Sequence, residues 1–372
     1  MTMRRYDLDW LRVIVFALLI FYHVGMFFVP WGWHIKNNEI YEWLEYPMRF
    51  LNQWRLPILF VISGMGTYYA FSKRNGASFA WERIKRLFIP LVIGMLLIVP
   101  PQIYIERLAN NQFVGSYFQY WPQEAFIGVY PEGNLSWHHL WFLPYLLLFS
   151  LLCIPVFLFL RKNPNNYLIR WIRKELRRPI GLYIFLIPIY ITEAFVEPFF
   201  DVTHALIGDW FALSNYGVFF FFGFVLISVQ KEFWALVEQH RKQFFITGLF
   251  SFTAYILLRV IWEDSVLIHF TEAFLKVFNL WTWILILFGY AAYYLNRSSK
   301  ILSYCNQAVY PFYILHQTIT IVLAYWIMDL DWSFWIKASI LIMGTFLIAW
   351  GIYELGIRRW KLIRPLFGVK NR

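Results

Sequence analysis

The chain has 372 residues, of which 60% are hydrophobic, 22% are aromatic and only 15% are charged. Soluble proteins have about 45–50% apolar residues, so this composition argues against a soluble protein and favours one that lies in a lipid bilayer. The net charge of +11 comes largely from lysines and arginines in short connections between apolar stretches. That distribution is typical of membrane topology control and argues against nucleic-acid binding.

The first apolar stretch, residues 11–30, follows a basic N-terminus and does not end in a convincing cleavage site. We therefore expect a retained membrane span rather than a removable signal peptide. The stretch opens near Asp9 and Arg12, and His23 follows eleven residues after Arg12. Eleven residues make about three helical turns and a rise of about 16 Å, so both side chains lie on one face. They could line one polar path from the inner boundary toward the middle of the membrane.

A purely structural role explains Arg12 better than it explains His23. Arg12 could equally be an anchor at the membrane boundary, and Asp9 lies three residues before it and can pair with it. His23 is the stronger candidate for chemistry, because ionisable side chains within a span are costly and commonly functional. Histidine also accepts a proton from a hydroxyl group near neutral pH.

Further apolar stretches are long enough, or nearly so, to cross about 30 Å of hydrocarbon as helices. Lysine and arginine concentrate in every second connection and in both terminal segments, whereas the other connections are rich in acidic residues such as Asp264 and in aromatic residues. We therefore expect an all-α integral membrane protein, a bundle of about ten transmembrane helices with both termini in the cytoplasm. The remaining stretches are 55–71, 87–105, 139–160, 180–197, 210–229, 244–261, 280–295, 304–328 and 334–357.

Three more histidines lie in or beside these stretches. His316 reaches the middle of the ninth stretch, where a helix–helix hydrogen bond and a functional role are equally good explanations. His138 and His139 open the fourth stretch at the outer boundary. An ordinary interfacial histidine is the favoured interpretation of His138, whereas the role of His139 stays open.

Two arginines, Arg83 and Arg86, lie three residues apart at the inner end of the third stretch. On one side of a helix they could bind phosphate groups, although their place on the basic inner side explains them equally well. The sequence contains no phosphate-binding loop, nucleophile elbow or zinc-protease motif. Neither cysteine indicates a metal site, and we expect one membrane domain over residues 1–372 without a separate soluble domain. Other polar residues in or near spans could pair within the bundle, namely Glu193, Asn215, Arg259 and Glu354.

Several short motifs, taken in order, resemble the acyltransferase family 3 membrane proteins over nearly the whole chain. Within that family the chain looks most like the glucan biosynthesis protein C branch, which is linked to succinylation of periplasmic glucans. The motifs are Arg5-Tyr6-Asp7-Leu8-Asp9-Trp10-Leu11-Arg12 followed by His23, Leu56-Pro57-Ile58-Leu59-Phe60-Val61-Ile62-Ser63-Gly64, Arg83-x-x-Arg86, His139-Leu140-Trp141-Phe142-Leu143, the His316 segment, and Tyr353-Glu354-Leu355 leading to Leu366-Phe367-Gly368.

The resemblance implies an acyl donor on the cytoplasmic side, usually acyl-coenzyme A, and a glycan hydroxyl as acceptor on the periplasmic or outer side. It implies no permanently bound cofactor and a location in the cell inner membrane. The acyl group could be acetyl or succinyl; for succinyl, Arg55 or Arg259 could bind the second carboxylate. The oligomeric state stays open.

The residues and the resemblance together give a mechanistic hypothesis. Arg83 and Arg86 bind the phosphates of acyl-coenzyme A, and Arg12 holds the donor as it enters the bundle. His23 acts as general base on the acceptor hydroxyl or takes the acyl group itself, while His139 and His316 orient the acceptor or tune His23. A secondary transporter or flippase that uses the same histidines is the main alternative, and a non-catalytic partner in glycan export is a third.

Overall fold

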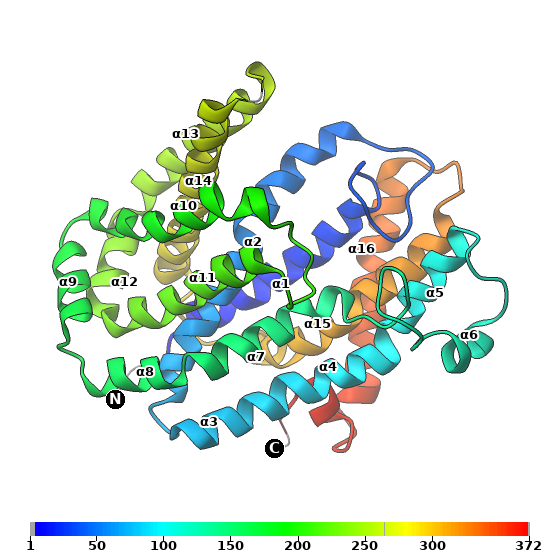
Figure 1. Cartoon of the computed structure of the whole chain (residues 1–372). Helices are drawn as coiled ribbons and strands as arrows, with labels where there is room; N and C mark the ends of the chain where they lie inside the picture. The colour runs from blue at the N-terminus through cyan, green and yellow to red at the C-terminus, as the bar shows by residue number, and fades with distance from the viewer. Residues whose placement is uncertain (1–3, 264, 371–372) are drawn as a thin grey trace. The chain divides into compact units, whose positions relative to one another are not determined.

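The computed structural model describes residues 4–263 and 265–370, so Asp264 and Arg372 lie outside the described residues. Over these ranges every regular element is a helix, apart from an isolated bridge between Val129 and Leu135. Eight described helices are long and apolar enough to cross a membrane, or up to nine when a bent pair is included. The chain is therefore an all-helical, multi-pass membrane protein (Figure 1).

A helix overlaps each apolar stretch that we identified in the sequence. The long helices are α1 (Tyr6–Met26), α2 (Glu45–Ala70), α11 (Trp210–Ser228), α13 (Arg241–Ile261), α14 (Val266–Tyr294), α15 (Lys300–Ile327) and α16 (Phe334–Gly351). The shorter helices are α3 (Gly76–Arg83), α4 (Ile89–Ile93), α5 (Pro100–Ala109), α6 (Tyr117–Gln123), α7 (Phe142–Leu152), α8 (Ile154–Lys162), α9 (Tyr167–Glu175), α10 (Leu186–Phe195) and α12 (Gln230–Gln239).

Short 3-10 and π segments complete the helical structure. The 3-10 segments are η1 (Glu42–Leu44), η4 (His138–Trp141), η5 (Pro179–Phe185), η6 (Glu197–Phe199) and η8 (Arg364–Phe367). The π segments are η2 (Ile84–Phe88), η3 (Gly94–Ile98) and η7 (Ile352–Ile357).

Two long helices begin well before the apolar stretches that predict them, and polar residues in these additional turns have partners. α2 begins at Glu45, whose carboxylate accepts a hydrogen bond from Arg49 at 2.8 Å. α14 begins at Val266 and contains Lys276, which forms an ion pair with Glu193. The polar first half of α2 also explains why this helix is absent from the eight spans that hydropathy selects.

Proline and wide helical turns shape two other spans. α7 and α8 form the bent pair, with an angle of 50° at a break next to Pro155 in the first turn of α8. Proline has no N–H and cannot continue the hydrogen-bond ladder of α7. The third span runs from Gly76 to Ala109 as α3, η2, α4, η3 and α5, so two π segments interrupt its α-helical turns.

The described chain divides into two compact units. The first comprises Met1–Arg12, Phe50–Trp81 and Tyr145–Leu302. Within it α13 packs along α14, which also contacts α10 and α12 (Figure 1). α2 and α11 approach so closely that a Cβ on Gly223 would lie 1.9 Å from the carbonyl oxygen of Val61. Glycine at this position lets the two backbones touch, as is common between membrane helices.

The second unit comprises Val13–Arg49, Glu82–Pro144 and Ser303–Arg372. The end of α1, the loop after it, α5, α15 and α16 contribute to one apolar core around fully buried Phe27 and Phe28. A second apolar cluster joins α15 to α16 and η7 through Leu315 and Tyr353. The polar residues described next lie between these same helices, so the apolar packing of this unit fixes their positions.

Candidate active site

The second unit brings together His23 of α1 and His316 of α15. Nδ1 of His23 lies 2.7 Å from Nε2 of His316, within hydrogen-bond distance, and the two rings stack with centroids 4.9 Å apart. His316 is fully buried, and His23 is half-buried. His23 of the first span therefore contacts a second ionisable side chain, His316, on another helix of the same unit.

The hydrogen bonds around His316 determine which nitrogen of each ring carries hydrogen. Nδ1 of His316 lies 2.6 Å from the backbone carbonyl oxygen of Tyr313. A carbonyl oxygen only accepts, so Nδ1 is the donor and Nε2 of the neutral His316 ring is an acceptor. His23 must then donate from Nδ1, which puts its lone pair on Nε2. A second group thus holds the tautomer of a basic histidine, the relation that activates histidine in catalytic triads.

His139, which begins the fourth predicted stretch, lies in η4 beside this pair. Its ring meets that of His316 edge-on, with centroids 5.2 Å apart. Nε2 of His139 donates to the carbonyl oxygen of Ile314 at 2.9 Å, and Nδ1 lies 3.3 Å from Nε2 of Gln102. Tyr313 donates from its hydroxyl to the carbonyl oxygen of His139 at 2.7 Å. Both ring nitrogens of His139 thus have partners, which suits a residue that positions its neighbours.

A glutamine pair continues this network to a second group of polar side chains. Gln317 follows His316 on α15 and donates to Gln102 on α5 at 3.1 Å. Nε2 of Gln317 also lies 3.0 Å from Nε2 of His34, in the loop after α1. His34 in turn bonds through Nδ1 to the carboxylate of Glu106 on α5. A line of hydrogen-bonding groups therefore runs from beside the histidine pair to His34 and Glu106.

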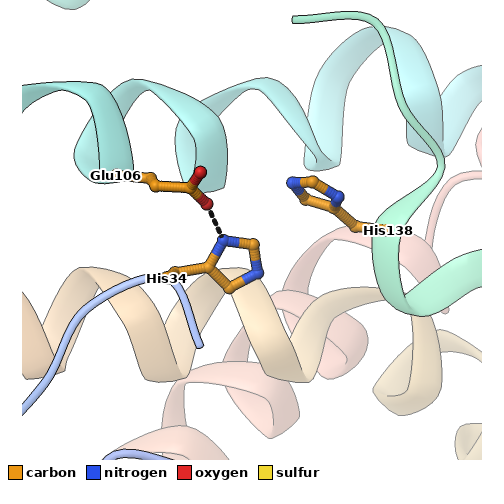
Figure 2. Close-up of side chains that lie close together, drawn as sticks. All are labelled: His34, Glu106 and His138. Carbon is orange, nitrogen blue, oxygen red and sulfur yellow. Dashed lines mark hydrogen bonds and ion pairs between the residues drawn. The ribbon is translucent and has the colours of Figure 1, made fainter. Parts of the chain in front are cut away.

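Figure 2 shows His34, Glu106 and His138 with their polar ends directed toward one another. The rings of His34 and His138 have centroids 4.7 Å apart. The sequence favours an ordinary interfacial role for His138 and gives no role to His34 or Glu106. In the structure one ligand atom from each of the three lies within 4.8 Å of those of the other two, a grouping able to hold a metal ion.

Arg12 lies on α1 but belongs to the first unit. Its guanidinium is 3.7 Å from a carboxylate oxygen of Asp9, the pairing that the three-residue spacing predicts, and its side chain is 34% exposed. The other oxygen of the same Asp9 carboxylate pairs with Arg4 at 2.7 Å. Arg12 is therefore an ion-paired and partly exposed residue near the start of α1.

Arg83 and Arg86 lie at the junction of α3 with η2, in the second unit. Arg86 is 3.5 Å from the carboxylate of Glu82 and its side chain is 44% exposed. Its backbone carbonyl accepts a hydrogen bond of 2.9 Å from the hydroxyl of Tyr310 on α15. The wider π turn of η2 begins between the two arginines, so the α-helical spacing from which we expect a shared face does not hold here. π turns of this kind are frequent at functional sites.

The other polar residues singled out in the sequence pair with neighbours. Glu354 contacts Arg358 at 2.8 Å and Tyr304 at 2.9 Å. In the first unit Arg259 pairs with Glu272, Glu193 pairs with Lys276, and Asn215 is 3.4 Å from Thr192.

Sequence reasoning missed four members of the polar network: His34, Gln102, Glu106 and Gln317. One local signal was available, because Gln102 and Glu106 are four residues apart and hence share a face of α5. Two polar residues on one face of an otherwise apolar helix indicate a polar partner inside the unit. His34 and Gln317 carry no comparable local signal.

Comparison with known proteins decides the family. A family model described as an acyltransferase domain, that of acyltransferase family 3, matches residues 5–354. The chain belongs to acyltransferase family 3. It is therefore an acyltransferase, and the match includes both members of the histidine pair. The resemblance noted in the sequence is confirmed.

Curated relatives of this family 3 acyltransferase include proteins named glucans biosynthesis protein C. Those of Escherichia coli strain K12 and of Shigella dysenteriae serotype 1 are each 25% identical over 391 aligned residues. Each alignment covers 99% of this chain and 95% of the relative. No solved structure matches the chain.

Proposed function

We propose that this acyltransferase moves an acyl group, acetyl or succinyl, from acyl-coenzyme A to a hydroxyl group of a glycan. One observation carries the proposal: the hydrogen-bonded row from the Tyr313 carbonyl through His316 to His23. It gives His23 the tautomer that a general base needs. The name of the curated relatives supports a glycan acceptor.

In the proposed reaction Nε2 of His23 takes the proton of the acceptor hydroxyl as its oxygen attacks the thioester carbonyl. The C–S bond then breaks, and the departing thiolate takes the proton from His23, so that coenzyme A leaves as the free thiol. The imidazolium that forms in between keeps its Nδ1–H directed at Nε2 of His316. A group held in this way needs no reorganisation when charge develops.

A covalent route is the alternative for the same residue. There Nε2 of His23 attacks the thioester itself and carries the acyl group until the acceptor hydroxyl displaces it. Rapid mixing with labelled acyl-coenzyme A in the absence of acceptor distinguishes the two routes. Label bound covalently to the protein supports the intermediate, whereas direct transfer leaves the protein unlabelled.

For the donor we propose Arg83 and Arg86 as ligands of the coenzyme A phosphates. Arginine binds phosphate through paired N–H groups, and the partial exposure of Arg86 leaves it accessible to a ligand. Arg12, one member of the Arg12–His23 spacing on α1, would contact the donor as it approaches His23.

We further propose ten membrane spans with both termini in the cytoplasm of an inner membrane. Hydropathy selects eight helices and a bent pair, and α2 is the remaining helix, with 26 residues. A helix of this length spans more than the roughly 30 Å of hydrocarbon in a bilayer. The concentration of basic residues in alternate connections supports this orientation, which puts the donor inside and the acceptor outside.

The test is acyl transfer by purified protein in liposomes, with labelled acyl-coenzyme A and an oligosaccharide acceptor. We expect ester-linked acyl mass on the oligosaccharide with the wild type and none with His23→Ala. The control is His240→Ala, because His240 is also a histidine but lies in the first unit, where it is half-buried and contacts Gln243. Transfer by His23→Ala at the control rate would eliminate the proposal.

Mass spectrometry of cell glycans separates the enzyme from the transport alternative. Loss of ester-linked acyl mass on deletion of the gene supports the acyltransferase. A changed location of glycans whose mass is unchanged would instead support a flippase or transporter and contradict the proposal.

A further inference from the structure

The cluster of His34, Glu106 and His138 has the donor atoms of a metal site. The three residues come from the loop after α1, from α5 and from the start of η4, all within the second unit. The side chains of His34 and Glu106 are only 9% and 10% exposed. A buried carboxylate facing two imidazoles needs compensating positive charge, which either a proton or a metal ion can supply.

Each of the three side chains also forms a hydrogen bond to a residue outside the cluster. Gln317 contacts Nε2 of His34 at 3.0 Å, and the Tyr130 hydroxyl donates to Oε1 of Glu106 at 3.1 Å. Nδ1 of His138 lies 2.9 Å from the hydroxyl oxygen of Ser136. Such outer contacts orient metal ligands, and here they leave one atom of each side chain directed to the shared centre (Figure 2).

His138 supplies the observation that an ion pair between His34 and Glu106 does not explain. Its Nε2 is buried and has no hydrogen-bond partner in the described structure. A buried polar atom without a partner carries a desolvation cost, which a bound ligand would offset. The backbone of His138 also has a φ of 39°, a left-handed conformation that is uncommon for residues other than glycine. The chain thus adopts an unfavourable backbone conformation that directs an imidazole nitrogen toward the other two ligands.

We propose that His34, Glu106 and His138 bind one divalent metal ion, with Zn²⁺ as the best match. Two histidines and one glutamate are a common zinc set, and such a set keeps a fourth position open for water or another oxygen ligand. Ligand atoms of a tetrahedral zinc site lie about 3.4 Å apart, given zinc–ligand distances of about 2.0–2.1 Å. The donor atoms of the cluster, all within 4.8 Å of one another, need only small shifts to reach that geometry.

Binding changes the tautomer of His34 with no net release of a proton. Nδ1 of His34 gives its hydrogen to solvent and binds the ion through the lone pair, Nε2 takes up a proton from solvent, and Glu106 exchanges its hydrogen bond for a metal–oxygen bond. Because Nε2 of His34 then donates, the amide of Gln317 turns to present its oxygen. The ion joins three segments that are distant in sequence, next to His139 of the candidate active site.

The guanidinium of Arg107, which follows Glu106 on α5, bonds to residues outside the cluster. Arg107 donates to Asn134 at 3.0 Å, to Gln112 at 2.6 Å and to the carbonyl oxygen of Gly133 at 2.9 Å. None of these bonds engages the three cluster side chains.

The test measures zinc binding by the purified full-length protein in detergent, first stripped with a chelator and then titrated with Zn²⁺ alone. We expect one tight equivalent by calorimetry and elemental analysis, and a rise in melting temperature on addition. We expect Glu106→Gln and His138→Asn to weaken the affinity about 100-fold or more. Asparagine tolerates the left-handed backbone at this position, so His138→Asn tests the ligand and not the loop.

His204→Asn is the matched control, because His204 also has a positive φ, of 55°, and lies outside the cluster. The control variant should bind Zn²⁺ as the wild type does. Co²⁺ gives a second measurement: a site of low coordination number shows strong visible absorption bands, which both cluster variants should lose. Wild-type protein that binds no Zn²⁺, or variants that bind it with wild-type affinity, would overturn the proposal. None of these measurements uses acyl transfer, so the result is independent of the proposed function.

Discussion

Both units of this acyltransferase bury polar side chains, but they do so with different chemistry. In the first unit the groups are complementary and stable in one state: Lys276 pairs with Glu193, and Asn279 bonds to Gln53 and, at 2.9 Å, to Ser251. Each of these bonds joins a fixed donor to a fixed acceptor, and no proton needs to move. These contacts hold helices together.

In the second unit the polar network contains several histidines, whose nitrogens exchange the roles of donor and acceptor when a proton moves. His23, His139 and His316 contact one another or share neighbours, and His34 joins through Gln317. Buried polar side chains occur in both units, so their presence alone does not identify a functional site. The proposed site differs from the pairs of the first unit because its hydrogen-bonded histidines can each gain or lose a proton.

The largest expected effect tests the row itself. We predict that His316→Ala lowers kcat by about 10²–10³-fold, since His23 loses the acceptor that fixes its tautomer. His269→Ala in the first unit is the control, because His269 donates to the carbonyl oxygen of Ala194 at 3.0 Å and its ring contacts Phe270. Steady-state acyl transfer measures both variants. An equal loss of kcat in both would remove the distinction between the units.

A variant of the first unit should affect stability instead. We predict that Lys276→Met destabilises the protein by about 2–3 kcal/mol, because it leaves the Glu193 carboxylate buried without its cation. The double variant Lys276→Met with Glu193→Gln removes both charges and should recover most of that stability. Thermal unfolding in detergent is the measurement. If kcat of the folded fraction fell as strongly as in His316→Ala, this pair would not be merely structural.

Removing the arginines at the junction of α3 and η2 should have a smaller effect. We predict that Arg83→Ala and Arg86→Ala each raise KM for acyl-coenzyme A by about ten-fold with little change in kcat, since each removes a charged contact to phosphate. The wild-type KM should rise with salt. Arg178→Ala is the control, because this arginine of the first unit is 67% exposed and pairs with Glu175. An unchanged KM in both variants would exclude them from donor binding.

The smallest effect, absent at neutral pH, concerns His204 in the loop before α11. Burial lowers the pKa of His204 to about 4 from its ordinary 6.5, and the nearby Asp209 opposes that change. The unfolded chain therefore takes up a proton below about pH 6.5 that the folded chain resists, so stability is complete above pH 6.5 and falls toward pH 4. His204→Asn should flatten this part of the pH–stability curve without changing kcat. A wild-type slope in the variant would contradict the assignment.

The helices and one face of the site could be predicted because both depend on local sequence. Apolar stretches indicate helices, and the eleven-residue spacing puts Arg12 and His23 on the same helix. The bounds were less predictable: α14 begins at Val266, well before its apolar stretch, and it includes Lys276, whose partner Glu193 lies 83 residues away.

The histidine pair itself could not be predicted from local pattern. His23 and His316 are 293 residues apart, and their contact depends on how α1 packs against α15. The same holds for His34 and Gln317, whose partners lie on other elements. The sequence identifies which residues are unusual in a membrane helix, whereas packing decides which of them meet.

The support for His316 comes from the backbone, at the carbonyl oxygen of Tyr313, and not from an acidic side chain. No single side-chain substitution removes that acceptor, and it adds no formal charge to a region of low dielectric. The resting pair is therefore electrically neutral when both rings are neutral. In the proposed reaction it acquires one positive charge just as the oxyanion forms beside it, so the attraction between them arises only during the transfer step.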